Sequence, residues 1–204
     1  MIYKLLPLVL FCIFSFKPLN TADAHIKGFT NTDPKLIAAS TKASLETKCK
    51  TLYSVLDANN LSLPKFDSFL AAFQGYELLK FQGKISNEIL TIVDFSLSST
   101  VERMWVIDMK TQKVLLKSLV AHGRNSGTEF ATKFSNANES FQSSLGFYVT
   151  GEEYQGKHGT SLRLDGMEAG INDNARNRAV VIHAADYVSQ KLANATGYIG
   201  RSFG

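Results

Sequence analysis

Between residues 34 and 83 the apolar side chains recur every three or four positions, which is the spacing of amphipathic helices. Asp33 followed by Pro34 is typical of a helix start, and Asn59-Asn60 separates two such stretches. The pattern therefore predicts one helix that runs to about Leu56 and a second that ends near Gly83. Their apolar stripes consist of Leu45, Cys49, Leu52 and Leu56 in the first helix, and Phe66, Phe69, Leu70 and Phe73 in the second.

After Asn87 the spacing changes to the alternation of β-strands, with many β-branched and aromatic residues. Trp105 and Ile107 share one face of a predicted strand, and Met104 and Val106 share the other, so we expect that strand to be buried on both sides. The predicted strands cover residues 89–97, 101–109 and 114–120, and a polar turn at 110–113 joins the last two into a hairpin.

The remaining chain alternates between loops and short apolar runs. Residues 122–142 are rich in Asn, Ser and Thr and predict a long irregular loop, a kind of segment that is often functional. Short strands are predicted at 145–150, 161–164 and 179–182, and a short helix at 186–194. The expected class is α+β, with a helical segment over 25–87 followed by a β-rich domain of mixed sheets or a sandwich over 88–204.

The first 24 residues have the pattern of a secretory signal peptide. Lys4 precedes an apolar run from Leu5 to Phe16, and Ala22-Asp23-Ala24 supplies the small residues of a cleavage site. The run is shorter than the ~20 residues that a membrane span needs, although an uncleaved anchor is the alternative. We therefore expect export to the periplasm or cell envelope, without a stable membrane span in the mature chain.

Composition narrows the function classes further. The chain is 45% hydrophobic and 20% charged, as in ordinary globular proteins, and its net charge of +4 is diffuse, which argues against a nucleic-acid partner. Beyond the signal segment Cys49 is the only cysteine, and its place on a helical stripe predicts a buried, inert thiol. His122, His158 and His183 are too dispersed to predict a zinc site, so no metal or cofactor is expected.

Several separated motifs carry a resemblance when they are taken together. They are Ser144-Leu145-Gly146-Phe147-Tyr148, Gly156-Lys157-His158-Gly159, Ser161-Leu162-Arg163-Leu164, Gly170-Ile171-Asn172-Asp173-Asn174, Val181-Ile182-His183 and Gly200-Arg201-Ser202-Phe203-Gly204. In this order they resemble the catalytic domain of the murein L,D-transpeptidases, the YkuD-type fold, over roughly residues 88–204. The resemblance implies action on peptidoglycan stem peptides, at the bond between diaminopimelate and D-alanine.

The resemblance also assigns residues. His183 matches the histidine that activates the catalytic cysteine, and Ser202 and Gly204 match a Ser-x-Gly-Cys turn. The cysteine would be the residue after Gly204, so the resemblance implies that the sequence stops one residue before its nucleophile and is inert as written. Ala184, where most of the family has Gly, and Phe203, where many members have a second His, depart from the pattern and leave His183 as the single base.

Two further residues are candidates for substrate binding. His158 lies in a loop between two glycines and could face the substrate cleft. The alternative is that it is an ordinary solvent-exposed loop histidine. Arg201 could bind a stem carboxylate through two hydrogen bonds, or it could instead support the loop.

Three functions follow. The first is the thiol acyl-transfer enzyme in incomplete form, giving a 3-3 cross-link or a shortened stem. The second is a truncated, non-catalytic peptidoglycan-binding protein. The third is a metal-dependent amidase that uses His158 and His183.

Overall fold

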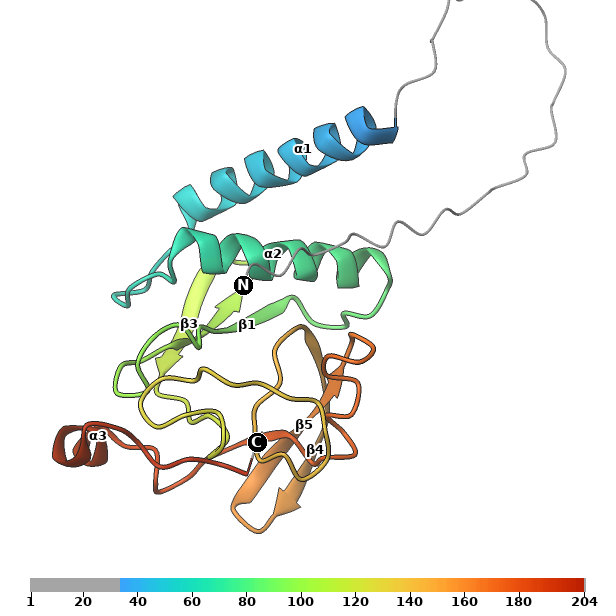
Figure 1. Ribbon diagram of the computed structural model, residues 1–204. Coiled ribbons are helices and arrows are strands. Elements are labelled where there is room, and N and C mark those ends of the chain that lie inside the picture. Colours follow the sequence, from blue (N-terminus) through green and yellow to red (C-terminus); the bar gives the residue numbers. More distant parts are fainter. Residues whose placement is uncertain (1–33, 204) are drawn as a thin grey trace, which may run out of the picture.

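The computed structural model describes residues 34–203 (Figure 1). The signal segment predicted at 1–24 and the turn residue Gly204 lie outside this range. The elements are α1 (Pro34–Val55), α2 (Phe66–Phe81), β1 (Ile89–Val93), β2 (Met104–Asp108), β3 (Lys113–Ser118), β4 (Tyr148–Gly156), β5 (Gly159–Gly166), β6 (Val181–His183) and α3 (Gln190–Thr196). Three helices and two antiparallel three-stranded sheets confirm the α+β class, and both predicted N-terminal helices are present.

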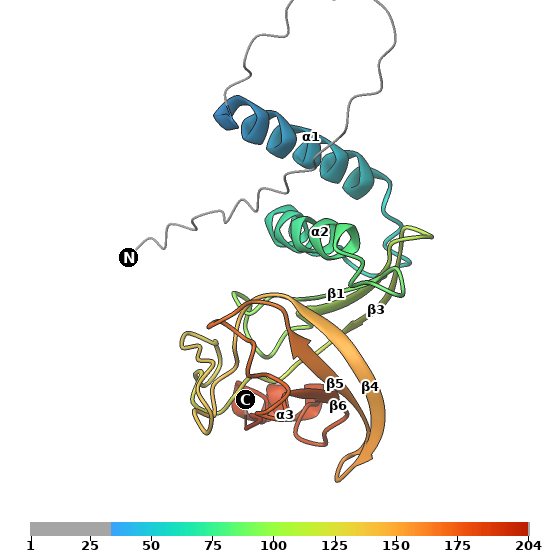
Figure 2. The ribbon, with the colours of Figure 1, turned by 90° about the vertical axis from the view of Figure 1, so that its right-hand side faces the viewer.

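The first sheet, in the order β1-β2-β3, is covered by α2, and α1 lies on the outer side of α2 (Figure 2). The two helices supply the apolar stripes that the spacing predicted. Phe69 and Phe73 stack with ring centroids 6.1 Å apart, and Trp105 donates its indole N–H to the Ser62 carbonyl at 2.8 Å. Burying such large side chains is worth about 1.5–3 kcal/mol each, so this layer supplies the main apolar core.

Strand β2 differs from its prediction. Trp105 and Ile107 are buried against the helices, whereas Met104 and Val106 on the opposite face are only partly buried. The expectation that this strand is buried on both sides was therefore wrong. Alternation with one buried face is the usual state of a strand in a small antiparallel sheet.

The second sheet has the order β4-β5-β6 and lies below the first one in Figure 1. The predicted strands exist, but the first and third begin later than predicted, and the middle one, β5, is longer at both ends. The stretch predicted at 145–150 begins at Tyr148 and continues to Gly156, and Ala179 adopts a left-handed φ of 54°, so β6 begins only at Val181. Strand β6 pairs with β5 through three residues. The final helix likewise begins four residues later than predicted, after the Ser189 hydroxyl that caps it.

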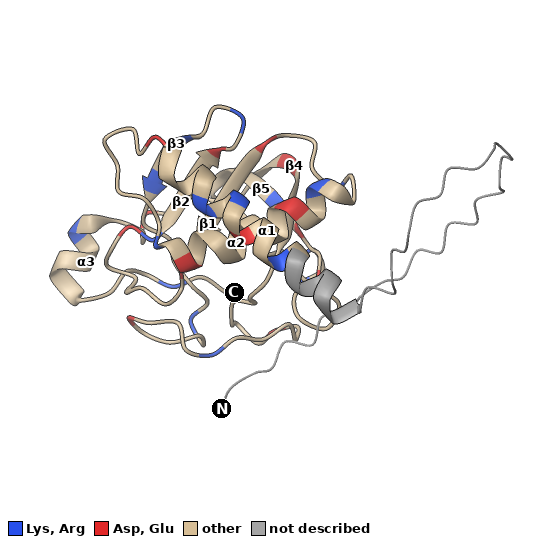
Figure 3. Ribbon diagram, turned by 90° about the horizontal axis from the view of Figure 1, so that it is seen from above, with Lys and Arg blue, Asp and Glu red and all other residues tan. Residues whose placement is uncertain are grey.

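One close contact joins the helical layer to the second sheet. A Cβ built on Gly75 in α2 would lie 2.1 Å from the Phe147 ring, so only glycine admits that ring. The helical segment and the β-rich part are thus packed together, while the boundary predicted at residues 87/88 stays a prediction. Basic and acidic residues are interspersed on the face seen in Figure 3. Within the described residues no helix is long and apolar enough to cross a membrane.

Candidate functional site

His183 ends strand β6, and its imidazole is oriented by its own neighbourhood. The ring Nδ1 lies 2.7 Å from the carbonyl oxygen of Ala184. A carbonyl can only accept, so Nδ1 carries the hydrogen and the lone pair of the neutral ring is on Nε2. The half-buried ring therefore has its base nitrogen free for a proton from another group.

His158 contacts His183, although 25 positions separate them. The tight β4–β5 hairpin places His158 beside Gly159, whose φ of +86° favours glycine. Antiparallel pairing then sets Ser161 of β5 opposite His183. The two imidazole rings stack with centroids 4.7 Å apart and planes 16° apart. His158 is exposed, as the alternative interpretation predicted, and the fold nevertheless brings its ring against His183, the predicted base.

The turn at residues 200–203 is fastened to a segment far away in the sequence. Gly123 and Ser202 form an isolated parallel bridge. The Ser202 N–H donates to the His122 carbonyl at 3.0 Å, and the Arg124 N–H donates to the Ser202 carbonyl at 2.8 Å. The long loop that follows β3 therefore holds this turn in place.

Arg201 supports the same loop. Its Nη1 donates to the carbonyl of Arg124 at 3.1 Å and to that of Gly127 at 3.3 Å. These bonds match the supporting role that the sequence left as the alternative to carboxylate binding. The binding role of Arg201 stays a prediction.

A buried polar network, which no sequence motif indicated, lies beneath the loop. Arg103 is fully buried and donates to the Leu97 and Val120 carbonyls and, at 2.8 Å, to Nδ1 of His122. Burial lowers the pKa of Arg103 to about 10, which leaves it charged at neutral pH. Burial, followed by the Arg103 and Arg201 charges, lowers the pKa of His122, although its bond to the Gly127 carbonyl acts in the opposite direction. A neutral His122 therefore accepts from Arg103 and donates to Gly127.

A pocket of about 340 Å³ borders the turn. Its walls combine two aromatic rings with polar side chains, namely Asn138, Glu139, Phe141, Asn177, Arg178 and Phe203. Arg178 joins the pocket wall to the loop, because its guanidinium donates to the carbonyls of Ser135 and Gln142. Phe203, which departs from the family pattern, is 70% exposed here.

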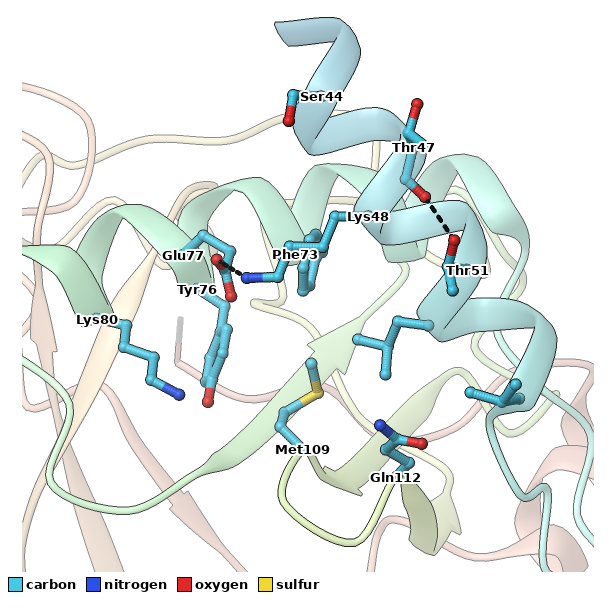
Figure 4. A pocket seen from close by; sticks show the side chains of 12 residues that line it. Ser44, Thr47, Lys48, Thr51, Phe73, Tyr76, Glu77, Lys80, Met109 and Gln112 are labelled. Atoms are coloured by element: carbon cyan, nitrogen blue, oxygen red, sulfur yellow. Dashed lines mark hydrogen bonds and ion pairs between the residues drawn. The ribbon is translucent and has the colours of Figure 1, made fainter. Parts of the chain in front are cut away.

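A larger pocket, of about 580 Å³, lies between α1 and α2 (Figure 4). Phe73 and Met109 form part of its floor, and the Lys48–Glu77 ion pair crosses it. Its lining comes from the two helices and the β2–β3 turn, so it shares no residue with the histidines or with the turn at 200–203.

Cys49 lies in the helical core and is 0% exposed, which confirms the predicted buried thiol. Burial, reinforced by the charge of Glu46, raises its pKa to about 11. A thiol in this state is protonated and inaccessible, so it is a poor nucleophile. Among residues 34–203 no three His, Cys, Asp or Glu side chains are grouped so that they could hold a metal ion.

The chain matches the L,D-transpeptidase catalytic domain family over residues 60–204 and belongs to that family. The match begins before α2 and includes both sheets. Membership implies peptidoglycan cross-linking and action at the cell wall. No curated protein and no solved structure matched the chain.

Proposed function

We propose that this protein is an exported L,D-transpeptidase that acts on the diaminopimelate–D-alanine bond of stem peptides, with His183 as the general base. The observation that carries the proposal is the hydrogen bond from Nδ1 of His183 to the Ala184 carbonyl. It selects the tautomer whose Nε2 can accept a proton from a thiol. Family membership over most of the chain supplies the reaction class.

The nucleophile in this proposal is a cysteine that follows Gly204. Its thiol proton moves to Nε2 of His183 while the sulfur attacks the carbonyl carbon of diaminopimelate. The tetrahedral intermediate collapses, the C–N bond to D-alanine breaks, and the imidazolium returns a proton to the leaving amine. An amine of a second stem then attacks the thioester and forms a cross-link, or water attacks it and leaves a shortened stem. Ser202 and Gly204 would shape the turn so that backbone N–H groups face the oxyanion.

The first test is to read the coding sequence beyond the codon for Gly204. An in-frame cysteine codon is expected. A stop codon would instead favour a peptidoglycan-binding protein without catalysis, since Cys49 cannot act as the nucleophile.

The second test uses the gene product that includes this cysteine. Replacing His183 with Ala should abolish acylation by a carbapenem, measured by the mass increase of the intact protein, while the circular dichroism spectrum stays unchanged. Acylation at the wild-type rate would show that His183 is not the base. Cys49→Ala is the matched control, because removal of the buried thiol should leave the mass increase intact.

The metal-dependent amidase is tested separately. The stacked pair of His158 and His183 offers two imidazoles, and no third ligand accompanies them within residues 34–203. Stoichiometric zinc in the purified protein, together with loss of amidase activity on chelation, would favour the amidase.

A further inference from the structure

Arg124 differs from the other arginines of the chain in what its guanidinium contacts. The sequence has six arginines. Arg163 and Arg176 form ion pairs with carboxylates, and Arg103, Arg178 and Arg201 donate to backbone carbonyls. The guanidinium of Arg124 has no hydrogen-bond or ion-pair partner among the described residues. Its donors are therefore available to a ligand.

Two aromatic rings hold this guanidinium in place. Its central carbon lies 4.0 Å from the ring centroid of Phe141 and 5.0 Å from that of Phe203. The two rings are 5.7 Å apart at an angle of 61°. A guanidinium that stacks on a ring face makes a cation–π contact through its plane. The N–H groups at its edge stay free to bind oxygen atoms.

The backbone of Arg124 places this group beside the turn at 200–203. Its N–H donates to Ser202 and its carbonyl accepts from Arg201. Phe141 and Phe203 also line the 340 Å³ pocket. A cation with free donors thus lies at the rim of a pocket that borders the predicted reaction centre.

Glu139 lines the same pocket and is also exposed. No basic side chain lies within ion-pair distance of its carboxylate in the part of the chain that the structure describes. Arg124 and Glu139 are therefore close to one pocket without neutralising one another. A ligand that carries a carboxylate and an ammonium together would satisfy both groups.

We propose that Arg124 and Glu139 bind the free amino-acid end of a diaminopimelate side chain, with Arg124 on the carboxylate and Glu139 on the ammonium. This specificity site rests on the proposed function, because it assumes that a stem peptide occupies the pocket. Phe141 and Phe203 would cover the methylene groups of the side chain. Stems that contain lysine in the third position lack the distal carboxylate and would use Glu139 alone.

The test is calorimetric titration with stem tetrapeptides of the gene product that includes the proposed cysteine. That cysteine is replaced by Ala, so the titration measures binding without turnover. The diaminopimelate stem should bind about ten- to a hundredfold more tightly than the lysine stem, the range for a hydrogen bond to a charged group. Arg124→Gln should remove most of this ratio, whereas Glu139→Gln should weaken both stems to a similar extent.

Two controls keep the outcomes separate. Arg163→Gln removes an arginine that also stacks on a ring, 4.4 Å from Tyr154, but is already paired with Glu152, so it should leave the ratio unchanged. A diaminopimelate stem with an amidated C-terminus tests the other carboxylate, and its affinity should stay the same. If amidation instead removes the effect of Arg124→Gln, the arginine binds the terminal carboxylate and the proposed assignment is wrong.

The failures are also distinguishable. The specificity site alone would be overturned if the stems bind without a preference for diaminopimelate. It would also be overturned if Arg124→Gln leaves that preference unchanged. Failure of every stem to bind at millimolar concentration would overturn both the site and the peptidoglycan function. Thermal unfolding of each variant near the wild-type temperature confirms that the fold is retained.

Discussion

The two sheets of this protein are stabilised by different kinds of interaction. Around β1-β2-β3 and the helices, the fully buried side chains are mainly apolar, as with Phe69, Ile107 and Val114. Around β4-β5-β6 and the long loop, the buried positions are mainly small or polar, including Ser126, Ser144, Ser161, Asn172 and Ala175. Every described residue of the predicted site belongs to this second, hydrogen-bonded region.

This difference between the apolar and the hydrogen-bonded region explains how the predicted site is held in position. An apolar core tolerates small shifts, because dispersion and burial have little directionality. Hydrogen bonds fix donors and acceptors within a few tenths of an ångström, and a lost partner leaves a buried group unsatisfied. A polar scaffold is therefore suited to positioning the turn at 200–203, while the helical layer supplies most of the stability.

The largest expected effect comes from the apolar region. Phe69→Ala should lower the free energy of unfolding by about 3–5 kcal/mol, as expected for loss of a fully buried ring. Urea denaturation of the purified protein measures it. Phe130→Ala, at a 46% exposed position of the loop, is the control and should change the free energy by less than ~0.5 kcal/mol. Equal losses in the two variants would contradict the proposed division of roles.

A middle-sized effect is expected from Asn172. Its Nδ2 donates to the Leu145 and Phe147 carbonyls at 3.1 and 3.0 Å, and its Oδ1 accepts from the Glu168 N–H. Asn172→Ala leaves these groups unsatisfied and should cost about 2–3 kcal/mol. Hydrogen exchange should show the loss of protection concentrated in β4 and β5. The exposed Asn194→Ala serves as the comparison, and uniform loss across both sheets would argue against a separately stabilised region.

The smallest effect is a pH dependence. The pKa of His122 is lowered in the folded protein, so the unfolded chain binds the proton more readily. His122 therefore lowers stability as the pH falls through 6.5, the ordinary pKa of a histidine, with a slope that approaches about 1.4 kcal/mol per pH unit. His122→Gln should flatten the curve between pH 7.5 and 5.5 in parallel urea titrations. An unchanged curve would show that His122 is not the group responsible.

The sequence predicted the apolar region better than the polar one. Helical and alternating spacings identified α1, α2 and the strands of the first sheet, because burial of large side chains produces these periods. The strand bounds in the second sheet differ from the prediction for two reasons. Ala179 adopts a left-handed backbone conformation, and hydrogen bonds to loop carbonyls stabilise this region in place of an apolar stripe. The family motifs pointed to His183 and the turn, but Arg103, His122 and Arg124 act through contacts that no local pattern reveals.

The bonds from Arg201 to the loop also bear on the order of folding. Arg201 reaches the Arg124 carbonyl across 77 positions of the chain. Contacts of such long sequence separation form slowly, since a large loop must close before they contribute any stability. The turn at 200–203 should therefore be among the last parts to acquire its native shape. Under the proposed function, a cysteine attached to that turn would meet its base only after the rest of the molecule had folded, and this order would limit premature reactions of the thiol.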